Sequence, residues 1–205
     1  REQGITIDVA YKYFSTPVRK FIIADTPGHV QYTRNMVTGA SLADTAIILI
    51  DARQGILEQT RRHSFISHLL HVPHLIVCVN KMDLVNYDEK LFNSIEKEYR
   101  EFLSSIGAVS PLQFIPVSAV NGENLANKSK AMTWFKGPTL LESLDSLKKA
   151  PPKSDRHFRM PVQAVYKFVS QNDDRRIIAG RIEAGKVKVG DKIIFTPSNK
   201  RSTVK

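Results

Sequence analysis

The sequence has one cysteine, Cys78, among its 205 residues. A single thiol can form neither a disulfide framework nor a zinc site built from several cysteines, so the disulfide-rich secreted class is excluded. Cys78 lies in the apolar run 74–79, and we expect it to be a core thiol of a cytoplasmic protein.

Long apolar runs are also absent. No stretch approaches the roughly 20 apolar residues that a membrane-spanning helix needs. A composition with 42% hydrophobic and 24% charged residues excludes a disordered chain. There is no secretory signal pattern, and the chain opens without Met in the middle of a motif, so we expect a cytoplasmic fragment with no membrane partner.

A third absence concerns phosphate binding. The sequence contains no G-x-x-x-x-G-K-[ST], the loop whose backbone N–H groups and lysine hold the phosphates in P-loop proteins. Any nucleotide site within these residues therefore lacks that phosphate cradle.

The net charge of +10 is unevenly distributed. Residues 1–150 hold 17 Lys and Arg against 15 Asp and Glu, whereas residues 151–205 hold 13 against 5. A basic module can bind nucleic acid. Its charges alternate with apolar residues along predicted strands, however, which favours a solvated barrel surface, and we do not expect a nucleic acid partner.

Most of the chain alternates strand-like and helix-like patterns. Alternating side chains predict a half-buried strand with Tyr11 and Tyr13 on its apolar side, paired with the next run as an antiparallel hairpin. The runs without alternation predict strands covered on both faces, as in a parallel sheet. The predicted strands are 5–14, 19–24, 45–51, 74–79 and 113–117, and the predicted helices are 30–40, 58–70, 88–106 and 139–149.

Three details qualify the predicted helices. In helix 58–70 the spacing of Phe65, Leu69 and Leu70 predicts one buried face. Gly107 marks the end of helix 88–106, as glycine commonly does. Thr139 and Glu142 have the spacing of a capping box that opens the last helix.

Pro151 and Pro152 break this pattern, and from Met160 short strands with glycine punctuation predict an all-β module. The predicted fold class is therefore α/β, a mostly parallel sheet followed by part of an all-β barrel. The predicted domains are residues 1–150 and 157–205.

The turn from Asp25 to His29 follows one of the predicted strands. An Asp at the carboxyl end of a strand can hold a magnesium ion, Pro27 fixes the bend, and Gly28 lets the backbone approach a phosphate. Taken alone, a D-x-x-G is more often an ordinary strand-to-helix turn.

Two further strand ends carry polar motifs. The carboxylate of Asp83 can accept two N–H groups from guanine, which adenine does not offer, while Asn80 serves the purine edge and the stem of Lys81 lies along the ring. A backbone N–H of Ser118-Ala119 can bind the base carbonyl. Because strand ends of a parallel sheet meet at one edge, the motifs together predict a guanine-nucleotide site. The predicted nucleotide-binding residues are Asp25, Thr26, Pro27, Gly28, His29, Asn80, Lys81, Met82, Asp83, Ser118 and Ala119.

In this order, D-x-P-G-H, N-K-x-D and S-A resemble the motifs of the translational GTPases, the elongation factor Tu-like family, across essentially all 205 residues. The resemblance implies a P-loop GTPase-type sheet, whose first strand and P-loop are absent here, and it implies GTP and Mg²⁺ as cofactors. Residues 1–8 resemble the end of the first switch, so Thr6 and Asp25 are implied to bind the metal. His29 is implied to be the catalytic residue that orients the attacking water.

Several stretches resemble one branch of that family more closely, the GTPase subunits of bacterial sulfate adenylyltransferases. This resemblance implies GTP hydrolysis coupled to formation of adenylyl sulfate from ATP and sulfate in sulfate assimilation, with adenylyl transfer on a catalytic partner subunit. A fused adenylylsulfate kinase downstream stays open. The stretches are REQGITIDVAYKYF, RKFIIADTPGHVQYTRNMVTGAS, DARQGILEQTRRHSFISHLL and WFKGPTLLESL.

Two alternatives remain. The segment 132–137 resembles archaeal and eukaryotic elongation factors, so delivery of aminoacyl-tRNA is one alternative, and a nucleotide-free G-domain scaffold is the other. In the family the missing strand lies between the strands at 19–24 and 45–51. We therefore expect a gap or an exposed apolar seam there, and weak or no GTP binding by these 205 residues.

Four histidines, His63, His68, His71 and His74, invite a metal hypothesis. They lack the helical His pair with a carboxylate that a zinc helix shows, so roles on the helix surface and at helix ends are favoured.

Overall fold

A computed structural model describes residues 8–108, 111, 113–148, 153–167 and 176–205. The chain divides into two compact units, Arg1–Leu147 and Lys148–Lys205. The domain limits expected from the sequence, 1–150 and 157–205, stay predictions. Among the described residues, no helix combines the length and the apolar character that crossing a membrane requires.

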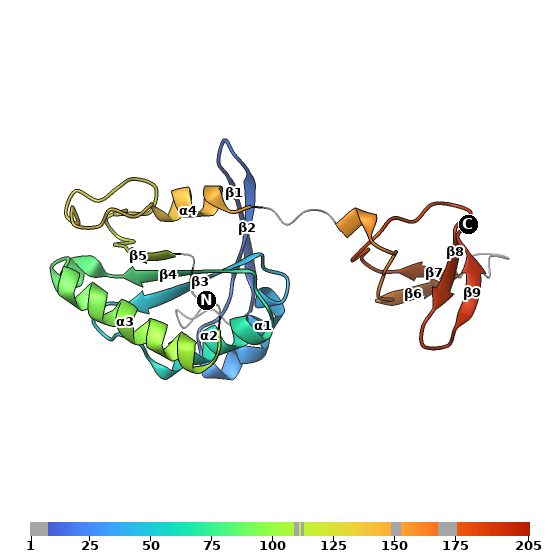
Figure 1. Ribbon diagram of the computed structural model, residues 1–205, viewed down its shortest axis with the longest axis horizontal. Helices are drawn as coiled ribbons and strands as arrows, with labels where there is room; N and C mark the ends of the chain where they lie inside the picture. Colours follow the sequence, from blue (N-terminus) through green and yellow to red (C-terminus); the bar gives the residue numbers. More distant parts are fainter. Residues whose placement is uncertain (1–7, 109–110, 112, 149–152, 168–175) are drawn as a thin grey trace. The chain divides into compact units, whose positions relative to one another are not determined.

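The first unit is built on a parallel sheet with the strand order β3-β4-β5 (Figure 1). The middle strand β4 is buried from Ile76 to Val79, as expected for an apolar strand covered on both faces. The sheet confirms the predicted α/β class. Its strands are β3 (Thr45–Asp51), β4 (His74–Asn80) and β5 (Gln113–Pro116).

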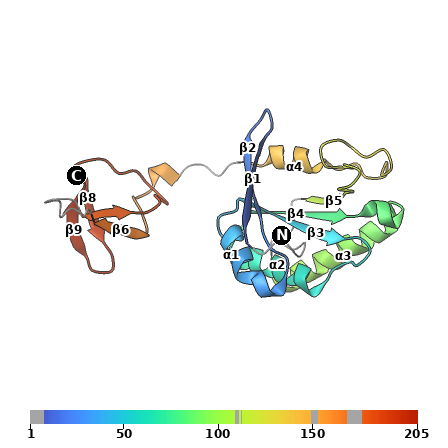
Figure 2. The same ribbon diagram turned by 180° about the vertical axis from the view of Figure 1, so that it is seen from behind.

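Helices lie on both faces of this sheet (Figures 1 and 2). The helices are α1 (Thr33–Ala40), α2 (Glu58–Leu69), α3 (Glu89–Ser105) and α4 (Leu140–Ser146), with the short 3-10 helices η1 (Val30–Tyr32) and η2 (Met82–Val85). Because successive strand residues point to opposite faces, Val77 and Val79 pack against α3 while Ile76 and Cys78 pack against α4.

Two helix starts follow from local hydrogen bonding. The Asp88 carboxylate accepts the backbone N–H groups of Lys90 and Leu91 at the start of α3. At α4 the capping box is confirmed, because Thr139 and Glu142 each accept the other's backbone N–H. These caps fix where each helix enters the unit.

The predicted buried face of α2 is wrong. Phe65 and Leu69 are 42% and 57% exposed, whereas three hydroxyl residues are buried. The Ser64 hydroxyl donates to the carbonyl oxygen of Thr60 at 2.6 Å and shares a 2.6 Å hydrogen bond with the Tyr99 hydroxyl of α3. The hydrogen bond between Ser64 and Tyr99 joins the two helices, and apolar spacing does not reveal such a contact. The buried residues of α2 are Thr60, Ser64 and Ser67.

The strands β1 (Ala10–Ser15) and β2 (Lys20–Asp25) form the predicted antiparallel hairpin. Within the described residues this hairpin is a sheet of its own and does not pair with β3. The predicted burial is therefore wrong: Tyr13 is 74% exposed and Ile22 is 66% exposed, and no residue of the two strands is fully buried.

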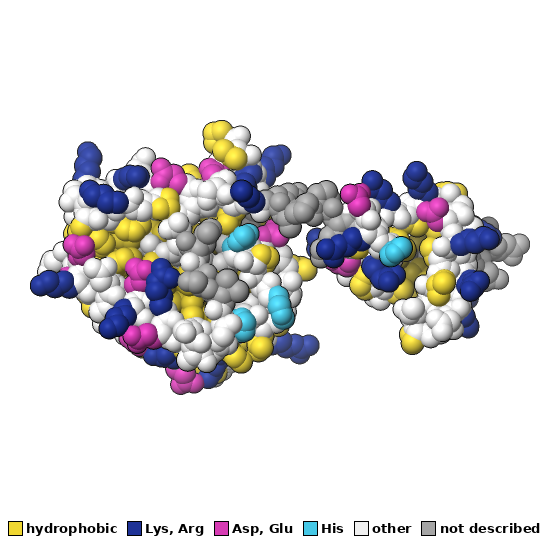
Figure 3. Space-filling view, viewed as in Figure 1, with side chains coloured by type: hydrophobic (Ala, Val, Ile, Leu, Met, Phe, Trp, Pro, Cys, Tyr) yellow, Lys and Arg dark blue, Asp and Glu magenta, His cyan; other side chains and the backbone are white. Residues whose placement is uncertain are grey.

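An exposed apolar seam, defined as Ile22 and Ile23 of β2 with Ile47 and Leu49 of β3, agrees with the gap predicted from the sequence. Ile48 and Ile50 point to the opposite face of β3 and are buried. Hydrophobic side chains are visible at the surface of both units (Figure 3).

The described part of the second unit contains only short strands and one 3-10 helix. Lys and Arg side chains are spread over its surface (Figure 3). The strands form two antiparallel pairs, β6-β7 and β8-β9, which agrees with the predicted all-β module. The Pro151-Pro152 break lies outside the described residues. The elements are η3 (Lys153–Asp155), β6 (Ala164–Lys167), β7 (Arg176–Ala179), β8 (Lys192–Phe195) and β9 (Lys200–Thr203).

Candidate functional site

The carboxyl ends of β3, β4 and β5 meet at one edge of the parallel sheet. Asp51 lies beside Asn80 in the β3–β4 ladder, and the Ala52 N–H donates to the Asn80 carbonyl oxygen at 2.9 Å. On the other side, the Val117 N–H donates to the carbonyl oxygen of Val79 at 2.8 Å. The three loops that follow these strands are therefore tied together by backbone hydrogen bonds.

Asn80 joins two of the predicted motifs. Its Oδ1 accepts the backbone N–H of Lys81 at 2.7 Å and that of Ala119 at 3.0 Å. The buried Ser118 anchors the second loop by accepting the Asn121 N–H through its hydroxyl at 3.3 Å. The residues at 80–83 and 118–119 thus lie together, although the binding role of each stays a prediction.

The side chains of Met82 and Asp83 differ in what they can contribute. Met82 is fully buried and packs in the core, so its side chain does not face a ligand. Asp83 is partly exposed, and within the described residues nothing donates a hydrogen bond to its carboxylate. Both oxygens are free to accept N–H groups, as the predicted recognition of guanine requires.

The sequence reasoning missed Asp51. Its carboxylate accepts the Lys81 ammonium at 2.8 Å and the Arg53 guanidinium at 2.7 and 3.1 Å. Hydrogen bonds from Arg53, and then from Lys81, hold the pKa of Asp51 well below its usual range, although burial acts in the opposite direction. The signal was available, since Asp51 ends a strand just as Asp25 and Asn80 do.

The turn after β2 carries the other predicted residues. Asp25 is the last residue of β2 and is partly exposed, and within the described part of the chain no group donates to its carboxylate. Pro27 is buried, whereas Gly28 and His29 are exposed. The His29 ring lies 6.4 Å from that of Tyr32, centroid to centroid.

An unpaired carboxylate at a strand end suits a magnesium ion, which proteins usually hold with one or two carboxylates plus substrate phosphates. In the described residues, no group of three or more His, Cys, Asp or Glu is placed to hold a metal ion. Asp25 therefore fits as a partial ligand. Thr6, the other predicted ligand, lies outside the described residues.

Two further residues lie near this turn. Gly39 of α1 is buried so close to Thr26 that a Cβ at this position would collide with the Thr26 methyl group. A Cβ on Gly28 would lie 3.9 Å from Cε1 of His63. His63 is partly buried, its Nε2 has no hydrogen-bond partner in the described structure, and burial lowers its pKa, helped by the charge of Arg62. The sequence favoured a surface or helix-end role for His63, and no apolar pattern could have shown these contacts.

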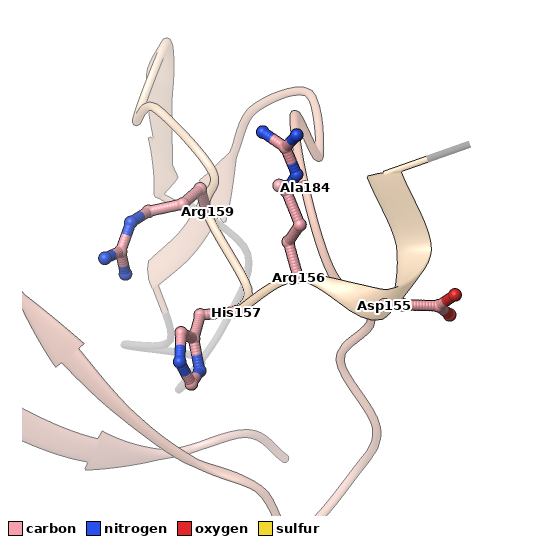
Figure 4. Close-up of a pocket in the computed structure, with 5 residues that line it drawn as sticks. All are labelled: Asp155, Arg156, His157, Arg159 and Ala184. Carbon is pink, nitrogen blue, oxygen red and sulfur yellow. The ribbon is translucent and has the colours of Figure 1, made fainter. Parts of the chain in front are cut away.

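A depression in the second unit is lined by Asp155, Arg156, His157, Arg159 and Ala184 (Figure 4). Its charged side chains point in different directions, and it lies in a different unit from the strand ends. The chemistry predicted from the sequence is therefore not located there.

Comparison with known proteins defines the class. The sequence profile of the elongation factor Tu GTP binding domain matches residues 1–150, and the chain belongs to this family of GTPase domains. Over its whole length the chain is 58% identical to sulfate adenylyltransferase subunit 1 of Vibrio cholerae serotype O1, and it covers 42% of that protein. The chain thus spans less than half the length of the curated relatives that it matches.

Solved structures agree with this assignment. The crystal structure of bacterial selenocysteine-specific elongation factor EF-Sec matches with a TM-score of 0.59 and 25% identity, covering 98% of this chain and 32% of that one. The structure of sup35 complexed with GDP matches with a TM-score of 0.56 and 29% identity, covering 93% of this chain and 46% of that one.

Proposed function

We propose that this chain is part of the GTPase subunit of a bacterial sulfate adenylyltransferase. The complete protein would couple GTP hydrolysis to synthesis of adenylyl sulfate from ATP and sulfate, in the cytoplasm. One observation carries the proposal: the chain is 58% identical, over its full length, to a protein named as subunit 1 of that enzyme. Identity to the elongation factor EF-Sec is only 25%, which supports a shared fold. The much higher identity to the sulfate adenylyltransferase subunit favours sulfate activation over translation.

In this proposal the base end of the nucleotide lies at the carboxyl edge of β3, β4 and β5. Asp83 accepts N1–H and the exocyclic amine of guanine, and the Ala119 loop donates to the base carbonyl. An adenine ring would leave the Asp83 carboxylate without donors, and an unpaired acceptor is costly. The hydrogen bonds of Asn80 support this arrangement, because they join the two loops that would contact the base.

The phosphate end lies at the turn after β2. Asp25, together with Thr6, would hold magnesium, which neutralises charge on the phosphates when it is bound. His29, exposed at the start of η1, would orient the attacking water. Positioning of this kind carries most of the catalysis in phosphoryl transfer, so a residue that only orients water suffices. Contacts with the terminal phosphate would order both switches, and hydrolysis would release them.

A second subunit would carry out adenylyl transfer. The word "subunit" in the name of the relative supports a complex, and the proposal assigns ATP and sulfate to the catalytic partner. Energy from GTP hydrolysis would then reach the partner through the switch segments near Asp25 and His29.

The test is a reconstitution with the complete protein. The protein is combined with the catalytic adenylyltransferase subunit, ATP and sulfate, and adenylyl sulfate is measured with GTP, with a non-hydrolysable GTP analogue and without nucleotide. Of these three conditions, we expect only GTP to raise the yield of adenylyl sulfate. Binding of aminoacyl-tRNA without such coupling would replace the proposal by an elongation factor, and a complete protein without GTP turnover would replace it by a scaffold.

A further inference from the structure

The pair formed by Lys81 and Asp51 links two of the loops at the strand-end edge. The Lys81 ammonium lies 2.8 Å from Oδ2 of Asp51, where Asp51 is the last residue of β3 and Lys81 follows the end of β4. The Asp51 side chain is 16% exposed and the Lys81 side chain 44%, so the acid is the less exposed, more fixed partner and the lysine the adjustable one. The pair therefore determines where the lysine side chain lies.

Asp51 is itself held in place by its own turn. The Arg53 backbone N–H donates to Oδ1 of Asp51 at 3.0 Å, and the Arg53 guanidinium donates to both oxygens. The parallel ladder places Asp51 directly beside Asn80. Because the carboxylate is fixed on several sides, it is a suitable anchor for a long and flexible lysine.

The backbone of Lys81 adds a second observation. Lys81 has φ 64° and ψ 33°, the left-handed conformation, which is unfavourable for a residue with a side chain. Glycine would adopt this conformation more easily, so the lysine side chain must contribute something that glycine cannot. Strained residues of this kind cluster at functional sites.

We infer that Asp51 is a positioning residue for guanine-nucleotide binding: by pairing with Lys81 it holds the lysine stem along the purine ring and ribose. This inference rests on the proposed function. Asp51 does not touch the base edge, which Asp83 reads. It acts through Lys81, and it therefore affects the affinity for every nucleotide that carries a flat purine, without choosing among bases.

The central experiment measures nucleotide affinity in the complete protein. Asp51→Asn keeps an Oδ1 that can accept the Arg53 N–H, so the turn is preserved and only the charge on Lys81's partner is removed. We expect GDP and inosine diphosphate to bind about three- to fivefold more weakly, because the pair is partly exposed and screened. The ratio of the two affinities should stay unchanged, because Asp51 does not touch the base edge. Asp83→Asn, in contrast, should change that ratio, because inosine lacks the exocyclic amine.

A double-mutant cycle separates positioning from a purely structural effect. If Asp51 acts through Lys81, Asp51→Asn should cause no further loss of GDP affinity in a Lys81→Ala background. A second full loss in that background would overturn the inference, because Asp51 would then act independently of the lysine.

The matched control is Lys97→Gln, which removes one exposed lysine charge from α3 and leaves Asp51, Arg53 and Lys81 in place. GDP affinity of this variant should stay within about twofold of the parent. Parent-like GDP binding by Asp51→Asn would overturn the inference and leave the proposed function intact. Absence of GDP binding by the unmodified complete protein would overturn both.

Discussion

His29 stands at the point where the buried Pro27 gives way to an exposed segment, one residue before η1. Its backbone is extended, with φ −81° and ψ 140°, its side chain caps nothing, and its carbonyl oxygen accepts the Tyr32 N–H at 3.0 Å. The backbone is thus fixed by local structure while the imidazole stays available. A side chain held in this way can act on a ligand without serving the fold.

Replacing His29 by Ala tests that role. We expect GTP hydrolysis by the complete protein to slow by about 100-fold or more, because orientation of the attacking water is lost. GTP affinity should change by less than about threefold, since the imidazole binds no ground-state group tightly. Single-turnover hydrolysis and equilibrium binding measure the two effects. His68→Ala, on the surface of α2, is the control, and equal hydrolysis by the His29 variant and its parent would contradict the assignment.

The sequence indicated which polar residues end the strands, but it did not indicate which side chains they pair with. Asn80, Asp83 and Ser118 could be selected because their residue types match a chemical requirement. The pairing of Lys81 with Asp51 depends on the register of β3 against β4, which places Asp51 beside Asn80. Register is set by packing over the whole sheet, so a motif search along the chain does not contain it.

Among the elements, α1 determines where the turn after β2 lies. Gly39 of α1 faces Thr26, Ala24 and Val9, and a Cβ there would lie 3.6 Å from the last two but would collide with Thr26. The helix and the turn can therefore approach only because position 39 has no side chain.

Gly39→Ala should push α1 away from the turn and destabilise this contact by about 1–3 kcal/mol, the usual cost of overpacking. Hydrogen exchange of the α1 amides in the complete protein measures it, and exchange should become faster. Thr26→Ser removes the methyl group that collides and should partly restore protection. Thr38→Ala, at an exposed position of the same helix, should leave the exchange rates unchanged. Unchanged exchange in Gly39→Ala would show that the turn adapts freely.

The contact between α2 and α3 should give the unit an alkaline limit. Burial raises the pKa of Tyr99 to about 12, against the effect of its hydrogen bond with Ser64, and burial raises that of Cys78 to about 12. Both groups are neutral when protonated, so the folded state binds their protons more tightly than the unfolded state does. Stability is complete below the unfolded-state pKa values, near pH 9–10, and decreases as pH rises toward the folded-state values near 12.

For Tyr99 alone the loss between pH 10 and 12 is about 2–3 kcal/mol. Urea unfolding followed by the fluorescence of Trp134, which packs in the core cluster around Tyr99, measures it. Tyr99→Phe should cost about 1 kcal/mol at neutral pH through the lost hydrogen bond. The variant should also lose less stability as pH rises, because only Cys78 would then contribute to the pH dependence. A parallel slope in the Phe variant would assign the pH dependence to other groups.

The elements themselves were largely predictable, because β4, α3 and α4 carry clear signals: an unbroken apolar run, an amphipathic period with an Asp cap, and a capping box. The buried face of α2 was not. Its burial comes from Ser64 and Thr60, whose hydroxyl groups are satisfied by Tyr99 and by the helix backbone. Apolar spacing assumes that only apolar residues are buried, and it fails where hydrogen bonds replace them.

In the first unit as a whole, the exposed apolar seam is the main departure from a closed core. Ile22 and Leu49 are 66% and 64% exposed, although each lies in a strand whose composition is that of a buried strand. The sequence could predict the seam only through the family resemblance, because the apolar runs alone predicted burial on both faces. Among the described residues the hairpin and the parallel sheet are separate, so β2 and β3 lack a strand neighbour on one side.

The base-reading and phosphate-binding parts of a nucleotide site are unequally represented in these residues, which leads to a prediction about nucleotide binding. The base-reading loops are tied together through Asn80, but these 205 residues contain no G-x-x-x-x-G-K-[ST], so no glycine-rich loop and lysine surround the phosphates. The triphosphate carries most of the charge of GTP and needs those donors. We therefore expect these 205 residues to bind GTP weakly or not at all in calorimetric titration, whereas the complete protein binds it. Micromolar GTP binding by the 205 residues would show that the base contacts and Asp25 suffice without a P-loop.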